Sequence, residues 1–182
     1  IADLTREGDV ALSGTITTSG SQDYKAAANL SDNTTLEGDS LMLASGVGGN
    51  SKSLDLNFSQ TTSLDGSFTN IANLMSEGDV SLNGNITTSG DQTYKAAASL
   101  AGYAILQGQS LLFSNGVDGA NHSLGLDFSK ATVLNGTFDN INDLTSGGDV
   151  AINGTIQTTG PQTYNANVSL DGNTKLEGSM LS

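Results

Sequence analysis

The sequence repeats itself with a period of about 70 residues, and this period constrains the fold more than any other feature. The clearest mark of the repeat is a Gly-Asp-Val triplet, found at positions 8–10, 78–80 and 148–150. Positions 1–70 and 71–140 agree at about half of their residues without insertion or deletion, and 141–182 begin a third copy. A period without length variation predicts a solenoid, because each coil of a solenoid must register with its neighbours.

Within one copy, apolar and polar residues alternate. Val10, Leu12, Gly14 and Ile16 fall on one parity, and the intervening residues are mostly small or polar. The segment 54–58 (Leu-Asp-Leu-Asn-Phe) follows the same rule. A period of two predicts β-strands with one set of side chains inward and the other in solvent, whereas the spacing of a buried helix face is absent.

Three Leu-x-Gly marks in the first copy, at positions 12–14, 36–38 and 64–66, predict corners. If each mark stands for one coil, a coil has about 23 residues and the chain has about eight coils. Pro161 cannot donate to a strand ladder, so we expect a turn there.

We therefore expect an all-β fold, a single parallel β-solenoid over residues 1–182. Its repeat units are 1–70, 71–140 and a partial 141–182, and we expect it to be an internal segment of a longer chain. A tandem of small antiparallel sandwiches is the alternative.

Composition excludes several functions. The net charge of −13 arises from 19 acidic and 6 basic residues, so we expect no binding to nucleic acid or to anionic lipid head groups. The chain has no cysteine, which excludes disulfides and cysteine-ligated zinc. No stretch approaches the ~20 apolar residues of a membrane span. We expect no cofactor and no metal site, although acidic surfaces can collect calcium weakly.

The third copy reads Gly-Asp-Val-Ala-Ile-Asn-Gly-Thr-Ile at 148–156, Thr-Thr-Gly-Pro-Gln-Thr-Tyr at 158–164 and Asn-Thr-Lys-Leu-Glu-Gly at 173–178. These elements recur at 8–38 and 78–108 and resemble the repeat region of filamentous-haemagglutinin-type large exoproteins. The resemblance implies a right-handed parallel β-helix. It also implies export through an outer-membrane secretion partner or an autotransporter route, an extracellular place on the bacterial cell surface, and a role in adhesion to host or neighbouring cells or in biofilms.

Two patterns suggest catalysis, and each has a simpler explanation. Gly38-Asp39-Ser40-Leu41 matches the signature of a family of serine esterases, but the corresponding segments of the other copies diverge. The only histidine, His122, has no Asp three positions before it, so Ser40 lacks a base, and we expect His122 to be an exposed turn residue. Repeated acids such as Asp9 and Asp79 we expect to be solvated charges rather than a catalytic pair.

Our leading expectation is therefore a structural shaft segment of a secreted bacterial adhesin or fibre, without catalytic residues. The alternatives are a β-helix face that binds glycans or proteins directly, and a carbohydrate-active β-helix. Residues 101–105 depart most from their counterparts, and Tyr103 is the candidate ligand contact. Unpaired strand edges at both ends also predict end-to-end stacking with a second copy.

Overall fold

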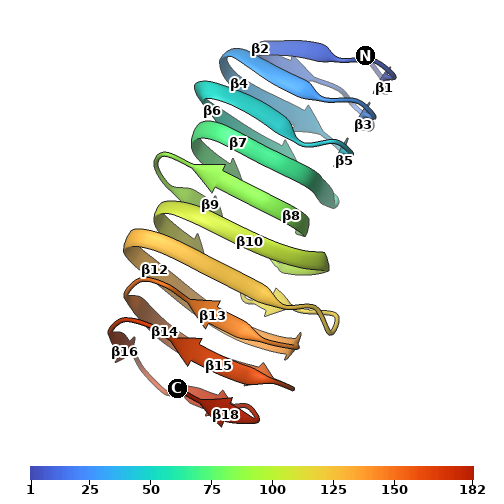
Figure 1. The fold of residues 1–182 in the computed structure, drawn as a ribbon. Helices are drawn as coiled ribbons and strands as arrows, with labels where there is room; N and C mark the ends of the chain where they lie inside the picture. Colours follow the sequence, from blue (N-terminus) through green and yellow to red (C-terminus); the bar gives the residue numbers. More distant parts are fainter.

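The computed structural model describes residues 1–182 as one right-handed parallel β-helix of about nine turns (Figure 1). All elements are strands, and every strand pair is parallel. The prediction of an all-β parallel solenoid is confirmed, and the antiparallel sandwich alternative is wrong. At ~4.8 Å per coil, nine turns give a rod of about 43 Å.

Strands vary from two to 18 residues because the longer ones continue around corners. Their bounds are β1 Leu4–Arg6, β2 Val10–Thr17, β3 Gln22–Tyr24, β4 Ala28–Gly38, β5 Leu41–Leu43, β6 Val47–Phe58, β7 Thr62–Ser76, β8 Val80–Thr88, β9 Gln92–Tyr94, β10 Ala98–Phe113, β11 Val117–Asp118, β12 Leu124–Ile141, β13 Leu144–Ser146, β14 Val150–Thr158, β15 Pro161–Tyr164, β16 Val168–Leu170, β17 Lys175–Glu177 and β18 Met180–Leu181.

Each coil has three sides, which meet at corners. We call them side 1, which contains Gln22–Tyr24, side 2, which contains Ala28–Leu30, and side 3, which contains the end of β4 from Thr34. The next coil begins on side 1 with Leu41–Leu43, which pairs in parallel register with Gln22–Tyr24. Every side is thus a parallel sheet whose strands come from successive coils.

The coils are shorter than the expected length of about 23 residues. Along side 2, Val10 pairs with Ala28, Ala28 with Val47 and Val47 with Phe68, and the mean spacing of the coils is ~19 residues. The Leu-x-Gly marks gave the wrong number of residues per coil because they do not occur once in every coil. Gly66 of the first copy and Gly84 of the second lie directly opposite each other on adjacent coils.

The sequence repeat does not contain a whole number of coils. Phe68 lies three coils after Val10, and Val80 lies two sides further on, on side 1, where it pairs with Thr62. One repeat therefore spans three and two-thirds coils. The third equivalent, Val150, pairs with Thr132 on side 3. Equivalent residues of successive copies are consequently turned by one side, and a feature returns to its first side only after three copies.

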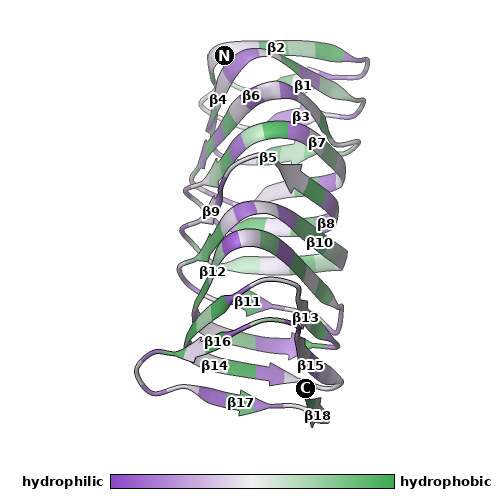
Figure 2. Ribbon diagram, turned by 60° about the vertical axis from the view of Figure 1, so that its left-hand side comes forward, coloured by the Kyte–Doolittle hydropathy of each residue, from purple (hydrophilic) through white to green (hydrophobic).

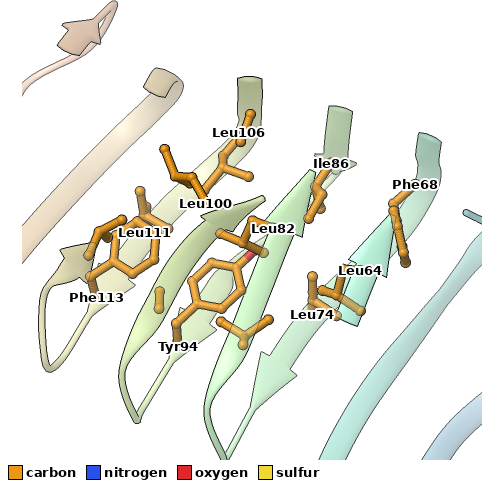
Figure 3. Close-up of a cluster of buried hydrophobic side chains, with 14 of the residues drawn as sticks. Leu64, Phe68, Leu74, Leu82, Ile86, Tyr94, Leu100, Leu106, Leu111 and Phe113 are labelled. Carbon is orange, nitrogen blue, oxygen red and sulfur yellow. The ribbon is translucent and has the colours of Figure 1, made fainter. Parts of the chain in front are cut away.

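The alternating apolar residues form one continuous core of 36 buried side chains that runs the length of the rod. Figure 2 shows the alternation of apolar and polar residues along the strands. In the middle of the rod (Figure 3), the Tyr94 and Phe113 rings stack with centroids 4.8 Å apart. Phe113 also packs edge-on against Phe138 at 5.8 Å. These rings come from three different coils, so the core itself ties the coils together.

Two kinds of glycine shape the corners. Gly66 and Gly84 have φ angles of +99° and +100°, and a Cβ at Gly84 would clash with the Gly66 carbonyl oxygen. Gly38 has no such φ, but a Cβ there would lie 2.7 Å from the Gly20 carbonyl oxygen, so close approach of two coils excludes a side chain. Pro161 is the first residue of β15, so the turn expected at this position lies immediately before it, in the bend at 159–160.

Candidate functional site

The most organised polar feature of the molecule is a buried Gln-x-Tyr pair that occurs once per repeat, which we call the Gln–Tyr clamp. In the first copy, Gln22 Nε2 donates to the Ile16 carbonyl on the preceding coil at 3.0 Å and to the Glu37 carbonyl on its own coil at 2.8 Å. The Tyr24 hydroxyl donates to Gln22 Oε1 at 2.9 Å. All strong hydrogen-bonding groups of the amide are thereby satisfied without water.

The clamp recurs with nearly the same geometry in the other copies. Gln92 Nε2 donates to the Ile86 and Gln107 carbonyls at 3.1 and 2.9 Å, and the Tyr94 hydroxyl donates to Gln92 Oε1 at 3.0 Å. Gln162 and Tyr164 repeat the arrangement. Because of the rotation of the repeat, the three clamps lie on sides 1, 3 and 2 of the rod.

The environment of the clamps makes the phenols of their tyrosines weak acids. Burial disfavours the phenolate and raises the pKa of Tyr24 to about 12, although the charge of Arg6 opposes the shift. Burial likewise raises the pKa of Tyr164 to about 12, and it raises the pKa of the fully buried Tyr94 further. A phenol that stays neutral and donates to a neighbouring amide holds structure together and is not available for acid–base chemistry near neutral pH.

The repeated acids lie on the outer surface, as expected, and they bond to the adjacent coil. Glu7 and Glu77 form ion pairs of 2.6 Å with Lys25 and Lys95, which lie one coil further on. Asp149 Oδ1 accepts from the Asn167 backbone N–H at 3.0 Å. Because of the rotation, Asp9, Asp79 and Asp149 lie on different sides of the rod and do not form one row.

The esterase-like segment forms a corner. Ser59 Oγ donates to Asp39 Oδ1 at 2.7 Å, and the carbonyl of Ser40 accepts from the Gln22 backbone N–H at 2.9 Å. His122 lies several coils further along, in a turn where its backbone N–H donates to the Gly119 carbonyl at 2.7 Å. Its side chain is partly exposed, and the structure does not bring it to Ser40.

Tyr103 is the one aromatic residue of the chain that is exposed, at 56%. It lies over Gly125 of the next coil, where an added Cβ would be 3.5 Å from the Tyr103 hydroxyl oxygen. The ring borders a shallow hollow on side 2 that is also lined by Ser123, Asp143 and Thr145. These residues come from β10, β12, β13 and their flanking turns on three consecutive coils. We call this surface the Tyr103 hollow.

Sequence reasoning singled out Tyr103 but missed the other residues of the hollow and the buried glutamines. Gly125 occupies the position of Asp55 in the first copy, and this substitution could have been noticed beside the change from Asn33 to Tyr103. The proximity of Asp143, which lies 40 residues after Tyr103, depends on the true length of the coil, because two coils of about 23 residues would place Asp149 there instead. The burial of Gln22 had a signal in the alternation, since it shares the inward parity of Tyr24.

No group of three or more His, Cys, Asp or Glu side chains is placed to hold a metal ion. None of the elements is a helix that could cross a membrane.

A stack of parallel three-sided coils that carries an internal sequence repeat defines the chain as a repeat protein of the β-solenoid class. The chain matches no family model, no curated protein and no solved structure at significance.

Proposed function

We propose that the chain is a structural shaft segment of a secreted, cell-surface bacterial adhesin or fibre, and that it is not an enzyme. The observation that carries this proposal is the rotation of the repeat by one side per copy. Val10, Val80 and Val150 lie on sides 2, 1 and 3, so equivalent residues of the three copies lie on three different sides of the rod. Such a surface suits a spacer, whereas a continuous binding face would need equivalent residues in one row.

The contacts between coils support a mechanical role. Each repeat contributes one Gln–Tyr clamp, in which Gln22, for example, bonds to carbonyls of two successive coils. The same repeat contributes an ion pair between neighbouring coils, as between Glu7 and Lys25. The exposed pairs add little stability, but the buried clamps resist separation of the coils because breaking them would leave polar groups unpaired in the core.

The charge of the chain fits a fibre that stays separate from its neighbours. A net charge of −13 in 182 residues, distributed over all three sides by the rotation, disfavours sideways association of rods. On the grounds of the motif resemblance at residues 148–164, we further propose an extracellular place on the bacterial surface and export with an outer-membrane partner.

Self-association at the ends is a second part of the proposal. In the last coil Val168, Leu170 and Leu181 are 39%, 57% and 53% exposed, while the equivalent Ala98 and Leu100 one repeat earlier are buried. Another coil would cover these side chains, whether it comes from the same chain or from a second copy.

Binding of a host or neighbouring-cell ligand through an exposed face is the alternative function, and the Tyr103 hollow is the observation that favours it.

Insertion of a second copy of residues 71–140 after residue 140 tests the shaft. A shaft should stay folded and lengthen by about 18 Å, because three and two-thirds coils of ~4.8 Å are added. Insertion of residues 71–105 alone is the control, since it breaks the order of the sides and should disturb folding. Cryo-electron microscopy or small-angle scattering measures the length. A full-repeat insertion that unfolds, or hydrolysis of esters or glycans by the purified chain, would overturn the proposal.

A further inference from the structure

The Tyr103 hollow differs from the same place in the first repeat by coordinated changes. Asn33 of the first copy accepts a hydrogen bond from the Ser53 backbone N–H at 2.9 Å, and Asp55 stands beside Ser53 on the same strand. In the second copy, Tyr103 replaces Asn33 and Gly125 replaces Asp55. One change adds a broad ring to the surface, and the other removes the side chain next to it.

A third change lies at the opposite border of the hollow, where it meets the following coil. In the preceding copy Asn73 Oδ1 accepts from the Asp91 backbone N–H at 2.9 Å, and Asp3 Oδ1 accepts from the Ser21 N–H at 2.8 Å. The equivalent Asp143 faces Pro161, which has no N–H, and its Oδ1 lies against Gly160 of that following coil. Asp143 keeps bonds of 3.3 Å from Ser123 Oγ and Asn142 Nδ2, both at Oδ2.

From these features we infer that the Tyr103 hollow binds a neutral sugar ring, with Tyr103 under the apolar face of the ring and Oδ2 of Asp143, the carboxylate oxygen on the side of Ser123, accepting from its hydroxyl groups. An exposed aromatic ring offers a flat apolar surface for C–H groups. A carboxylate accepts strong hydrogen bonds, while the Ser123 and Thr145 hydroxyls can donate or accept. A small number of convergent polar groups beside an aromatic ring is typical of small-molecule sites.

Charge selects the class of sugar. The chain has a net charge of −13, and the polar border of the hollow offers a carboxylate and hydroxyls but no Lys or Arg. An anionic sugar would therefore be repelled, whereas a neutral hexose would not. The span of three coils, about 9.6 Å between the outer two, accommodates one or two sugar rings. The inference does not depend on the shaft role, and its failure would leave that proposal standing.

Titration of the whole chain with methyl glycosides of neutral hexoses, followed by ¹H–¹⁵N NMR, tests the inference. We expect saturable shifts at Ser123, Gly125 and Thr145, and none at Ser53 and Asp55 of the first repeat. Tyr103→Asn and Gly125→Asp, which restore the residues of the first copy, should each weaken binding about tenfold or more. Both variants change outward positions, so unfolding midpoints should stay near that of the parent chain.

The reverse experiment uses the first repeat as a matched scaffold. The double variant Asn33→Tyr/Asp55→Gly should gain shifts at Ser53 and at position 55 with the same glycosides. The inference is overturned if no neutral glycoside in the panel shifts the hollow, if Tyr103→Asn binds as the parent does, or if the anionic N-acetylneuraminate binds as tightly as the neutral hexoses.

Discussion

At the scale of single residues, inward and outward parity determines what a position tolerates. Leu56 is 1% exposed between Leu36 and Ser76 of the neighbouring coils, while Asp55 points outward. Leu56→Asp would bury an unpaired charge and should lower the free energy of unfolding by about 4 kcal/mol or more. Asp55→Ser should change it by less than about 0.5 kcal/mol. Urea unfolding followed by circular dichroism measures both, and equal midpoints would contradict the parity.

Two core hydroxyls offer a stabilising change. Thr62 and Thr132 are buried, and their Oγ1 atoms have no hydrogen-bond partner. Thr62→Val and Thr132→Val should therefore each raise the free energy of unfolding by about 1 kcal/mol. Thr88→Val is the control, because Thr88 Oγ1 donates to the Gly90 carbonyl at 3.0 Å and its loss should destabilise the chain. Equal effects at Thr62 and Thr88 would show that the hydroxyl partners do not matter.

The clamp tyrosines predict a loss of stability at alkaline pH. Burial raises the pKa of Tyr24 and Tyr164 from 10.0 to about 12 in the folded chain. The folded state favours the neutral phenol, so this contribution is fully present below pH 10 and is lost as the pH rises from 10 toward 12. Urea midpoints measured in pH steps across this window should fall, and Tyr24→Phe should reduce the slope. A midpoint that is constant across the window would refute the prediction.

At the scale of elements, the strands could be predicted from the sequence and the length of the coil could not. Alternation placed Leu12, Leu54 and Leu64 inward, and all three are buried. Corners are local features, however, and their residues differ from coil to coil. The Leu-x-Gly patterns that end at Gly66 and Gly84 lie on adjacent coils, whereas the coil that contains Leu41–Leu43 has a corner glycine, Gly46, but no Leu-x-Gly pattern. Register between coils is a long-range property that no local motif encodes.

The candidate site, too, could be predicted from the sequence only in part. Tyr103 could be found because it interrupts the repeat, which is a property of the sequence alone. Gly125 and Asp143, which lie one and two coils further along the chain, become its neighbours only through the register of β10, β12 and β13. A coil of about 23 residues would have left Gly125 near Tyr103, but it would have placed Asp149 instead of Asp143 two coils further along.

The stacked corner glycines give a prediction at this scale. Gly84 has a φ of +100°, and a Cβ would meet the Gly66 carbonyl oxygen of the preceding coil. Gly84→Ala should thus cost about 2 kcal/mol or more, since both the backbone and the coil spacing must adjust. Gly8→Ala is the matched control, because no atom lies within 4 Å of a Cβ there. Thermal unfolding compares them, and a Gly84→Ala midpoint at or above that of Gly8→Ala would be inconsistent with the stacked corner.

At the scale of the whole molecule, the mismatch between the repeat and the coil determines where equivalent residues lie. With three and two-thirds coils per repeat, three copies are needed before a residue returns to its side, which corresponds to about 11 coils or about 53 Å of rod. The mismatch distributes the Gln–Tyr clamps over all three sides of the rod. A sequence change made in every copy would follow a helical path on the surface.

Crosslinking of engineered cysteines tests the coil length most directly, since the chain has no cysteine of its own. Ser63 and Ser81 lie directly opposite each other on side 1, whereas Thr87, which the longer expected coil would bring close to Ser63, lies on side 2. A short bis-alkylating reagent should join Ser63→Cys to Ser81→Cys within one chain, and it should leave the Ser63→Cys/Thr87→Cys variant unjoined. Efficient crosslinking of the second pair and none of the first would contradict the observed coil length and, with it, the rotation of the repeat.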